Sequence, residues 1–417
     1  MEIDVLLATV GLLGVVVAAL SAQIRRLPIS EPLFGLIAGV VIGPQVLDVM
    51  RMAPITSEHS VLHEVSRILL AVSVMAVALR YPAADVRRSW RPVALLLLVA
   101  MPVMAVVTAA LGWFLLSIPL MTAALLGAAL CPTDPVLASS VVTGEDAERD
   151  LPARNRQILS LESGANDGLA LPLVLAAIAI AGGISAGTAI RESLWQVLGG
   201  VIMGAAMGWA GGRALKWGDK YGATDAAPAL FFTVVLALGI LGAAGLLHLD
   251  GILAVFVGGL LFNVAGTGDE RAAEVPIDEA INRFVVLPLF VLLGAALPWQ
   301  AWGELGWNGV ALAVGVLLLR RLPILLLLRR PLRLSTPDAL YLGWFGPVGV
   351  SALFYLTMEA DRMGVDETVL AAGSLVLVAS TVAFGVSGVA GRALYAKAAR
   401  TSSSSSDNQG RAQHRGE

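Results

Sequence analysis

The stretch Cys131-Pro132-Thr133-Asp134-Pro135-Val136 places an acid between two prolines inside an otherwise apolar segment, residues 119–142. A proline lacks a backbone N–H and disfavours helix in the residue before it, so the helix is predicted to break here. Broken backbone at membrane depth is tolerated only where protein or a wet cavity surrounds it. The stretch therefore predicts a buried, functional interruption of a membrane helix.

A second polar stretch lies in the next apolar segment, residues 156–181. It reads Glu162-Ser163-Gly164-Ala165-Asn166-Asp167. Ser163, Asn166 and Asp167 are spaced i, i+3 and i+4, so they share one face of a helix. Ionisable groups inside a membrane are costly and mark functional sites by default. Together the two stretches predict a site for a small hard cation or a proton.

Composition places the whole chain in the membrane. Of its 417 residues 57% are hydrophobic and only 14% are charged, whereas soluble domains carry about 25% charged residues. We predict an all-α polytopic membrane protein with about 13 transmembrane helices. The spans are 3–22, 28–47, 62–80, 92–117, 119–142, 156–181, 193–215, 227–247, 250–265, 280–298, 306–328, 338–359 and 367–391. The lipid bilayer is thus a partner, and we expect no nucleic acid, no cofactor and no enzymatic activity.

The distribution of the 28 Lys and Arg residues predicts the orientation. With these spans, Arg51, Arg191 and Arg362 fall in loops on one side, and most of the others lie on the opposite side. Because cytoplasmic loops are enriched in basic residues, the N-terminus is predicted outside and the C-terminus inside the cell membrane (inner or plasma membrane). Residues 1–392 form one transporter domain, and the Ser-rich tail 393–417 is predicted to be a disordered cytoplasmic segment.

A second interruption suggests an internal inverted repeat. The twelfth span contains Gly346-Pro347-Val348-Gly349, seven spans after the break in the fifth. An odd offset places the two spans in opposite orientations. Interrupted helices at matching positions of two inverted halves are the best sequence indication of a transporter's substrate site. We therefore predict two broken helices that cross.

These motifs resemble those of a known family. Thr133-Asp134-Pro135-Val136, the Glu162–Asp167 stretch and Trp344-Phe345-Gly346-Pro347-Val348-Gly349-Val350 are similar to the sodium/proton exchangers of the cation:proton antiporter-1 type. The resemblance covers about residues 1–392 and is closest to the fungal-like plasma-membrane branch and its bacterial relatives. It implies antiport of Na⁺ for H⁺, with K⁺ or Li⁺ as alternative cations, and we expect a homodimer.

The resemblance also implies roles for individual residues. Asp167 would be the essential carboxylate, and Asp134, Ser163 and the Thr133 carbonyl would complete the cation shell, with Glu162 nearby. The residues expected to support this site are Asn166, Arg320, Arg321, Pro132, Pro135, Gly346 and Pro347. One arginine of the eleventh span would pair with Glu162; we favour Arg321 because Leu322-Pro323 follows it. Many exchangers carry G-L-R-G where this chain has Gly-Pro-Val-Gly, so the role of that arginine does not transfer.

Several alternatives stay open. Asp134 could act only as a helix cap, and an ion pair of Glu162 with Arg321 could be purely structural. A cation channel, or a carrier for another small cation, would also need acids in the membrane. The string Gly266-Thr267-Gly268-Asp269 is similar to an intramembrane protease motif but lies in a charged loop, so we reject that function. Because Asn166 cannot titrate, one proton for one cation is the simplest exchange, and Asp134 would be the candidate for a second proton.

Overall fold

The computed structural model describes residues 2–19, 30–142, 144–221, 229–265, 286–364 and 366–413, and all regular secondary structure in these ranges is helical. A π-helix, η1 (Leu96–Ala100), lies between α5 and α6. The α-helices are α1 (Glu2–Ala19), α3 (Glu31–Ile42), α4 (Ser60–Arg80), α5 (Ala83–Leu95), α6 (Met101–Leu116), α7 (Leu120–Ala129), α8 (Pro135–Val142), α9 (Gly144–Asp150), α10 (Ala153–Leu169), α11 (Leu171–Ile180), α12 (Ala186–Lys220), α13 (Ala229–Leu246), α14 (Gly251–Ala265), α16 (Leu287–Ala295), α17 (Trp299–Leu319), α18 (Leu322–Leu327), α19 (Thr336–Trp344), α20 (Val350–Met363) and α21 (Glu367–Gln413). The predicted fold class is confirmed.

The predicted number of about 13 transmembrane helices is not confirmed. Within the described residues, 6 helical stretches are long and apolar enough to cross a membrane. They are Ser60–Arg80, Ala84–Leu116, Ala153–Ile180, Ala186–Gly218, Trp299–Leu327 and Glu367–Ala398. Five further apolar helices are shorter, among them α7, α14 and the helix Glu31–Ile42. Shortening is expected where a span is divided into two half-helices, because neither half covers the ~30 Å of hydrocarbon alone.

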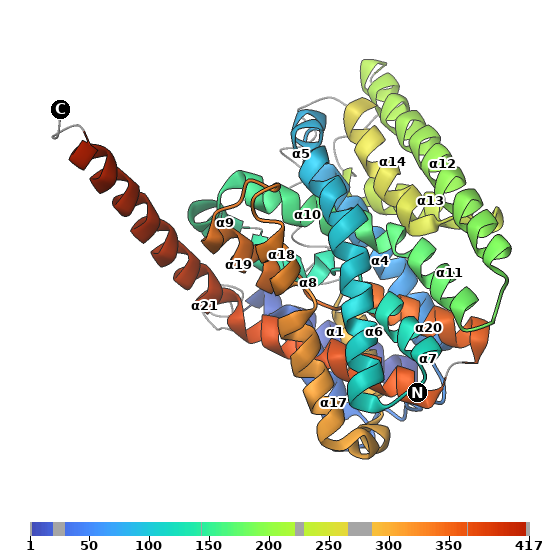
Figure 1. Ribbon diagram of the computed structural model, residues 1–417. Helices are drawn as coiled ribbons and strands as arrows, with labels where there is room; N and C mark the ends of the chain where they lie inside the picture. The colour runs from blue at the N-terminus through green and yellow to red at the C-terminus, as the bar shows by residue number, and fades with distance from the viewer. Residues whose placement is uncertain are drawn as a thin grey trace.

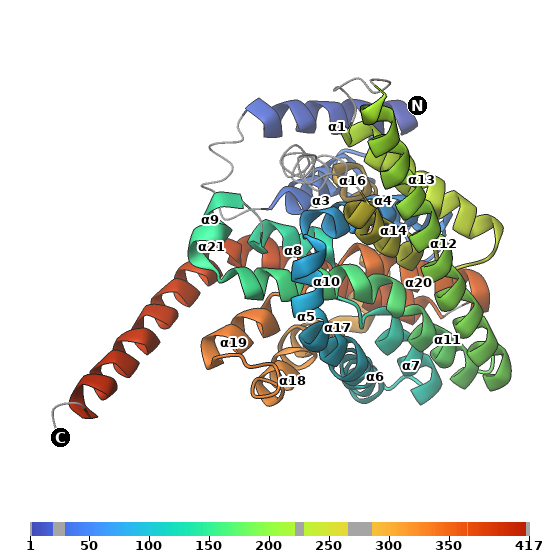
Figure 2. The same cartoon turned by 90° about the horizontal axis from the view of Figure 1, so that it is seen from above.

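The helices form a bundle with polar residues at its centre. Helices α4, α8, α10 and α20 lie in the middle, and α12, α13 and α14 form one flank (Figures 1 and 2). The flank packs closely because Gly204 of α12 lies against the Ala254 carbonyl of α14, where a Cβ would collide. Small residues at such contacts let membrane helices approach each other. Helix α10 is surrounded by protein along most of its length, since every residue from Ile158 to Gly168 is buried.

The fifth predicted span is broken as expected. Helix α7 ends at Ala129 and α8 begins at Pro135, so residues 130–134 are not helical. Proline is favoured in the first turn of a helix because its missing N–H has no partner there, so Pro135 starts α8. Pro132, three residues earlier, keeps the preceding backbone extended. The unwound residues are buried, which satisfies the requirement for broken backbone at this depth.

The twelfth predicted span is also broken, and the two breaks touch. Helix α19 ends at Trp344 and α20 begins at Val350. The Asp134 backbone N–H donates to the Pro347 carbonyl at 2.9 Å, which joins the two unwound stretches. A Cβ at Gly349 would lie 2.6 Å from Cγ of Asp134, so only glycine allows this approach. The prediction of two broken, crossing segments is confirmed.

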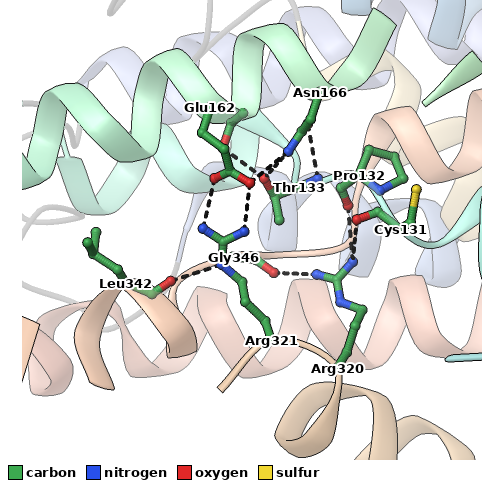
Figure 3. Close-up of polar contacts among 10 residues, drawn as sticks. Cys131, Pro132, Thr133, Glu162, Asn166, Arg320, Arg321, Leu342 and Gly346 are labelled. Atoms are coloured by element: carbon green, nitrogen blue, oxygen red, sulfur yellow. Dashed lines mark hydrogen bonds and ion pairs between the residues drawn. The ribbon is translucent and has the colours of Figure 1, made fainter. Parts of the chain in front are cut away.

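A third interruption was not predicted. We expected residues 306–328 to form one continuous span, but α17 ends at Leu319 and α18 begins at Leu322. Pro323 accounts for the change, because it cannot donate to the carbonyl of Leu319, four residues earlier, and its ring clashes with that carbonyl. Arg320 and Arg321 occupy the interruption, and their side chains reach different partners (Figure 3).

Some of the other predictions remain untested. The rejected protease-like string at 266–269 and the start of the predicted span 280–298 lie outside the described residues. Helix α21 continues without a break past residue 392 to Gln413 and extends away from the bundle (Figure 1). The division into a transporter domain and a disordered tail therefore stays a prediction.

Candidate functional site

The Asp134 carboxylate joins the N-terminal ends of two half-helices. Its side chain is fully buried. Oδ1 accepts the Leu137 N–H of α8 at 2.8 Å, and Oδ2 accepts the N–H groups of Val350 and, at 3.4 Å, Ser351 of α20. The first N–H groups of a helix have no partner within the helix and carry a positive partial charge. One carboxylate therefore neutralises the ends of α8 and α20 together.

Arg320 binds backbone carbonyl oxygens at the C-terminal ends of the half-helices α7 and α19. Its guanidinium donates to the carbonyl oxygens of Leu130 (2.5 Å), Cys131 (3.4 Å) and Pro132 (3.1 Å) in the first break. It also donates to the Gly346 carbonyl in the second break at 2.5 Å (Figure 3). Carbonyls at a helix C-terminus attract cations. Arg320 and Asp134 thus satisfy both polar ends of the crossing.

Arg321 is the arginine that pairs with Glu162. Two charge-assisted bonds of 2.8 Å join its guanidinium to the two carboxylate oxygens (Figure 3), and both side chains are at most 2% exposed. Nε of Arg321 also donates to the Leu342 carbonyl of α19 at 3.0 Å. The pair therefore attaches the polar face of α10 to the half-helix α19.

Asn166 connects α10 to the first break. Its Nδ2 donates to Oγ1 of Thr133 at 2.7 Å and to Oε1 of Glu162 at 3.0 Å, and its Oδ1 accepts the Thr133 N–H at 3.2 Å (Figure 3). The hydroxyls of Thr133 and Ser163 are 3.1 Å apart. These contacts fully engage the amide, and they bring the Thr133 and Ser163 oxygens to one place beside the crossing.

Asp167 differs from all these groups. It is fully buried, yet neither oxygen of its carboxylate has a hydrogen-bond partner among the described residues. The Ser351 hydroxyl faces it without a closed hydrogen bond, and the negative fields of Asp134 and Glu162 reach it. The Tyr355 hydroxyl donates to the Asp167 backbone carbonyl at 2.5 Å. An orphaned buried carboxylate is suited to a proton or a hard cation.

The structure therefore brings the predicted site residues together at the crossing. Asp134, Thr133, Ser163, Glu162 and Asn166 surround the crossing, and Asp167 lies beside them. No cluster of three or more His, Cys, Asp or Glu residues suited to a tightly held metal occurs within the described ranges. The donor set instead consists of carboxylate, hydroxyl and carbonyl oxygens, the ligands of hard cations.

Sequence reasoning missed four buried polar residues. It singled out none of Ser351, Tyr355 and Glu359 of α20. The signal was present, because these three residues recur at i, i+4 and i+8 directly after the second break and so share a helix face. Asp250, buried at the start of α14, was also overlooked.

Fold and site define a class of helical membrane protein in which two interrupted segments cross beside a buried carboxylate. The chain belongs to the family described as "Sodium/hydrogen exchanger, transmembrane", which matches residues 12–392. It is similar to Na(+)/H(+) antiporter 2 of Zygosaccharomyces rouxii, with 31% identity over 362 residues, 83% of this chain and 44% of that protein. It is also similar to the Na(+)/H(+) antiporter of Saccharomyces cerevisiae, with 32% identity over 362 residues, 83% of this chain and 37% of that protein.

The fold is shared with a solved archaeal structure. The sodium proton antiporter MjNhaP1 of Methanocaldococcus jannaschii at pH 8 matches with a TM-score of 0.72 at 18% identity, covering 95% of this chain and 99% of that one. The predicted family resemblance is confirmed. The chain spans less than half the length of the two fungal relatives.

Proposed function

We propose that this protein is a secondary antiporter that exchanges Na⁺ for H⁺ across the cell membrane by alternating access. The observation that carries the proposal is Asp167, whose buried carboxylate has no partner among the described residues at the crossing. Membership of the sodium/hydrogen exchanger family and the similarity to fungal Na⁺/H⁺ antiporters support it. The K⁺ and Li⁺ alternatives are decided by the experiment below.

The chemistry depends on a single negative charge. In a buried position the Asp167 carboxylate is stable when neutralised by a proton or by a cation, and the two compete for the same oxygens. A bare carboxylate in the hydrocarbon costs several kcal/mol, so movement of the empty, charged site is suppressed and ions do not leak. The Thr133 and Ser163 oxygens would add ligands for the cation, together with the Thr133 carbonyl.

Asp134 would contribute a fixed charge to the same site. Its oxygens accept three backbone N–H groups, and a carboxylate has about four lone-pair sites, so capacity remains for a neighbouring cation. With Asn166 unable to titrate, exchange of one proton for one cation follows. A bell-shaped pH profile is expected, because protons displace the cation at low pH and become scarce at high pH.

The remaining assignments are part of the same proposal. The protein would be a homodimer in the inner or plasma membrane, with its N-terminus outside and its C-terminus in the cytoplasm, as the basic residues indicate. A reporter fused after Arg400 would then be cytoplasmic, and one inserted at Gly303 would be external. An external reporter at Arg400 would overturn the orientation.

The decisive experiment uses proteoliposomes with an imposed pH gradient, to which Na⁺, K⁺ or Li⁺ is added separately. An antiporter dissipates the gradient only when its cation is present. A channel conducts the cation with no obligatory counterflow of protons. Cation flux without proton counterflow would favour the channel, and proton flux with K⁺ or Li⁺ alone would change the substrate.

A further inference from the structure

Glu359 is a second buried carboxylate without a partner. It lies in the last turns of α20, which ends at Met363, and its side chain is fully buried. Neither carboxylate oxygen has a hydrogen-bond partner among the described residues. Side chains this close to a helix end usually reach the membrane surface with their charge. Glu359 instead points into protein, away from the surface where its neighbours Asp361 and Arg362 lie.

No described neighbour offers a counter-charge. Helix α20 packs against α4, α7, α11 and α21. His63 of α4 and the N-cap residue His59 are engaged elsewhere: Nδ1 of His63 lies 3.0 Å from Oγ1 of Thr357, and Nε2 of His59 lies 3.0 Å from Oδ1 of Asp361. Arg67 of α4 pairs with Glu64 at 3.0 Å, and Arg80, the last residue of α4, donates to Oγ of Ser160 at 3.3 Å. Thr357 and Asp361 are two residues from Glu359 and thus lie on the opposite face of the helix.

The other neighbouring helices add little charge. Helices α7 and α11 contain no titratable side chain, and the first titratable residue of α21 after the exposed Glu367 in its first turn is Arg392, 25 residues further along the helix. An ionised carboxylate left without donors in such surroundings is strongly disfavoured. These surroundings therefore favour the neutral, protonated form of the Glu359 carboxyl group.

A row of side chains on one face of α20 extends from the exchange site to Glu359. Ser351, Tyr355 and Glu359 share one face of α20, with Ser351 facing the Asp167 carboxylate and Tyr355 donating to its backbone carbonyl. Eight residues at 1.5 Å rise place Glu359 about 12 Å from Ser351 along the helix. The buried Cys131 of the first break lies within electrostatic reach of both Asp167 and Glu359. The row thus runs from the site to the end of α20.

We propose that Glu359 is a proton-carrying residue on the path between Asp167 and the membrane face on which α20 ends. The proposal rests on the proposed antiport function. Glu359 would receive the proton that leaves Asp167, through water admitted along the row, and release it at that face. The cation would not require Glu359. Glu359 lies about 12 Å along α20 from Ser351, the residue that faces Asp167, so the proposed transfer runs through water.

The test separates proton transfer from cation movement in the full-length protein. Proteoliposomes of wild type, Glu359→Gln and Glu359→Asp are compared in two assays: Na⁺/H⁺ exchange driven by a pH gradient, and ²²Na⁺/Na⁺ exchange at equal pH on both sides. We expect Glu359→Gln to reduce Na⁺/H⁺ exchange at least tenfold while ²²Na⁺/Na⁺ exchange stays within twofold of wild type. Glu359→Asp restores the first activity because it retains the carboxyl group.

Each result decides between the alternatives. An equal loss in both assays would show a structural role, and no loss in either would show that protons bypass Glu359; both overturn the proposal. If Glu359→Gln does not accumulate in the membrane, Glu359→Met provides the same test, because it fills the apolar space without leaving an amide unpaired. A wild-type protein inactive in both assays would instead contradict the antiport function itself.

Discussion

Asp134 and Asp167 are two fully buried aspartates a short distance apart, and their surroundings differ completely. Asp134 accepts N–H groups from two half-helices, whereas Asp167 has no partner among the described residues. A carboxylate that accepts three backbone donors is stabilised in its charged form, and one without donors requires an incoming proton or cation. Under the proposed function, this difference suits Asp134 to holding the crossing together and Asp167 to exchange.

The same contrast holds for the neighbouring arginines. Arg320 binds only carbonyl oxygens at the two breaks, and Arg321 binds a carboxylate and one carbonyl. At the crossing, Asp134 and Arg320 therefore neutralise the partial charges of the helix ends. Beside them, Glu162 and Arg321 neutralise each other. Asp167 is the uncompensated group between them, which is where a mobile charge is expected to bind.

The largest expected effect is the loss of exchange activity when Asp167 is replaced. Asp167→Asn should abolish exchange, because an amide can neither release a proton nor neutralise a cation. Its melting temperature should stay close to wild type, since the carboxylate has no hydrogen bond to lose. Transport in proteoliposomes and thermal unfolding of the purified protein test both parts. Substantial residual exchange by Asp167→Asn would remove Asp167 from the mechanism.

Asp134 should show the reverse pattern, with a large loss of stability. Asp134→Ala leaves three backbone N–H groups without their acceptor, and each buried orphan costs about 1–3 kcal/mol. We expect a marked fall in melting temperature together with loss of exchange. Asp134→Asn keeps one acceptor oxygen and should lose less stability. Equal melting temperatures for Asp134→Ala and Asp167→Asn would contradict the distinction between the two aspartates.

The Glu162–Arg321 pair should give an intermediate loss. Removing one partner leaves an uncompensated buried charge, which costs about 3–5 kcal/mol. Glu162→Ala and Arg321→Ala should each melt early, and the double variant should recover part of the loss. A double-mutant cycle measures the coupling, and Arg320→Ala serves as the comparison because the hydrogen bonds of Arg320 go to backbone carbonyls and its side chain forms no ion pair with Glu162 among the described residues. Additive losses would show that the pair contributes no coupling energy.

The two helix breaks and the polar face of α10 could be predicted from the sequence. Prolines at 132, 135 and 347 locate both breaks, since their effect on backbone is local. The i, i+3, i+4 spacing likewise places Ser163 and Asp167 on one face of α10. Which of two adjacent arginines binds which group was open, because it depends on the angle at which distant segments cross. The unbonded state of Asp167 and the burial of Glu359 also depend on tertiary packing, and no local pattern reports it.

The smallest expected effect concerns Asn166 and membrane potential. Under the proposed one-for-one exchange, only one titratable carboxylate of the wild type takes part in the cycle, so the exchange rate should not respond to an imposed potassium-diffusion potential. Asn166→Asp places a second acid next to Glu162, whose oxygen lies 3.0 Å from the native amide. Repulsion between the two acids favours binding of a proton to the new one, and exchange should become sensitive to the potential as that proton cycles.

Asn166→Ala provides the control, because it removes the same hydrogen bonds to Thr133 and Glu162 without adding an acid. We expect Asn166→Ala to slow exchange while leaving it independent of potential. Potential dependence in both variants would trace the effect to the lost hydrogen bonds and not to the new charge. A strong response of the wild type itself would contradict one-for-one exchange, and Asp134 would then become the candidate for the second proton carrier despite its three backbone donors.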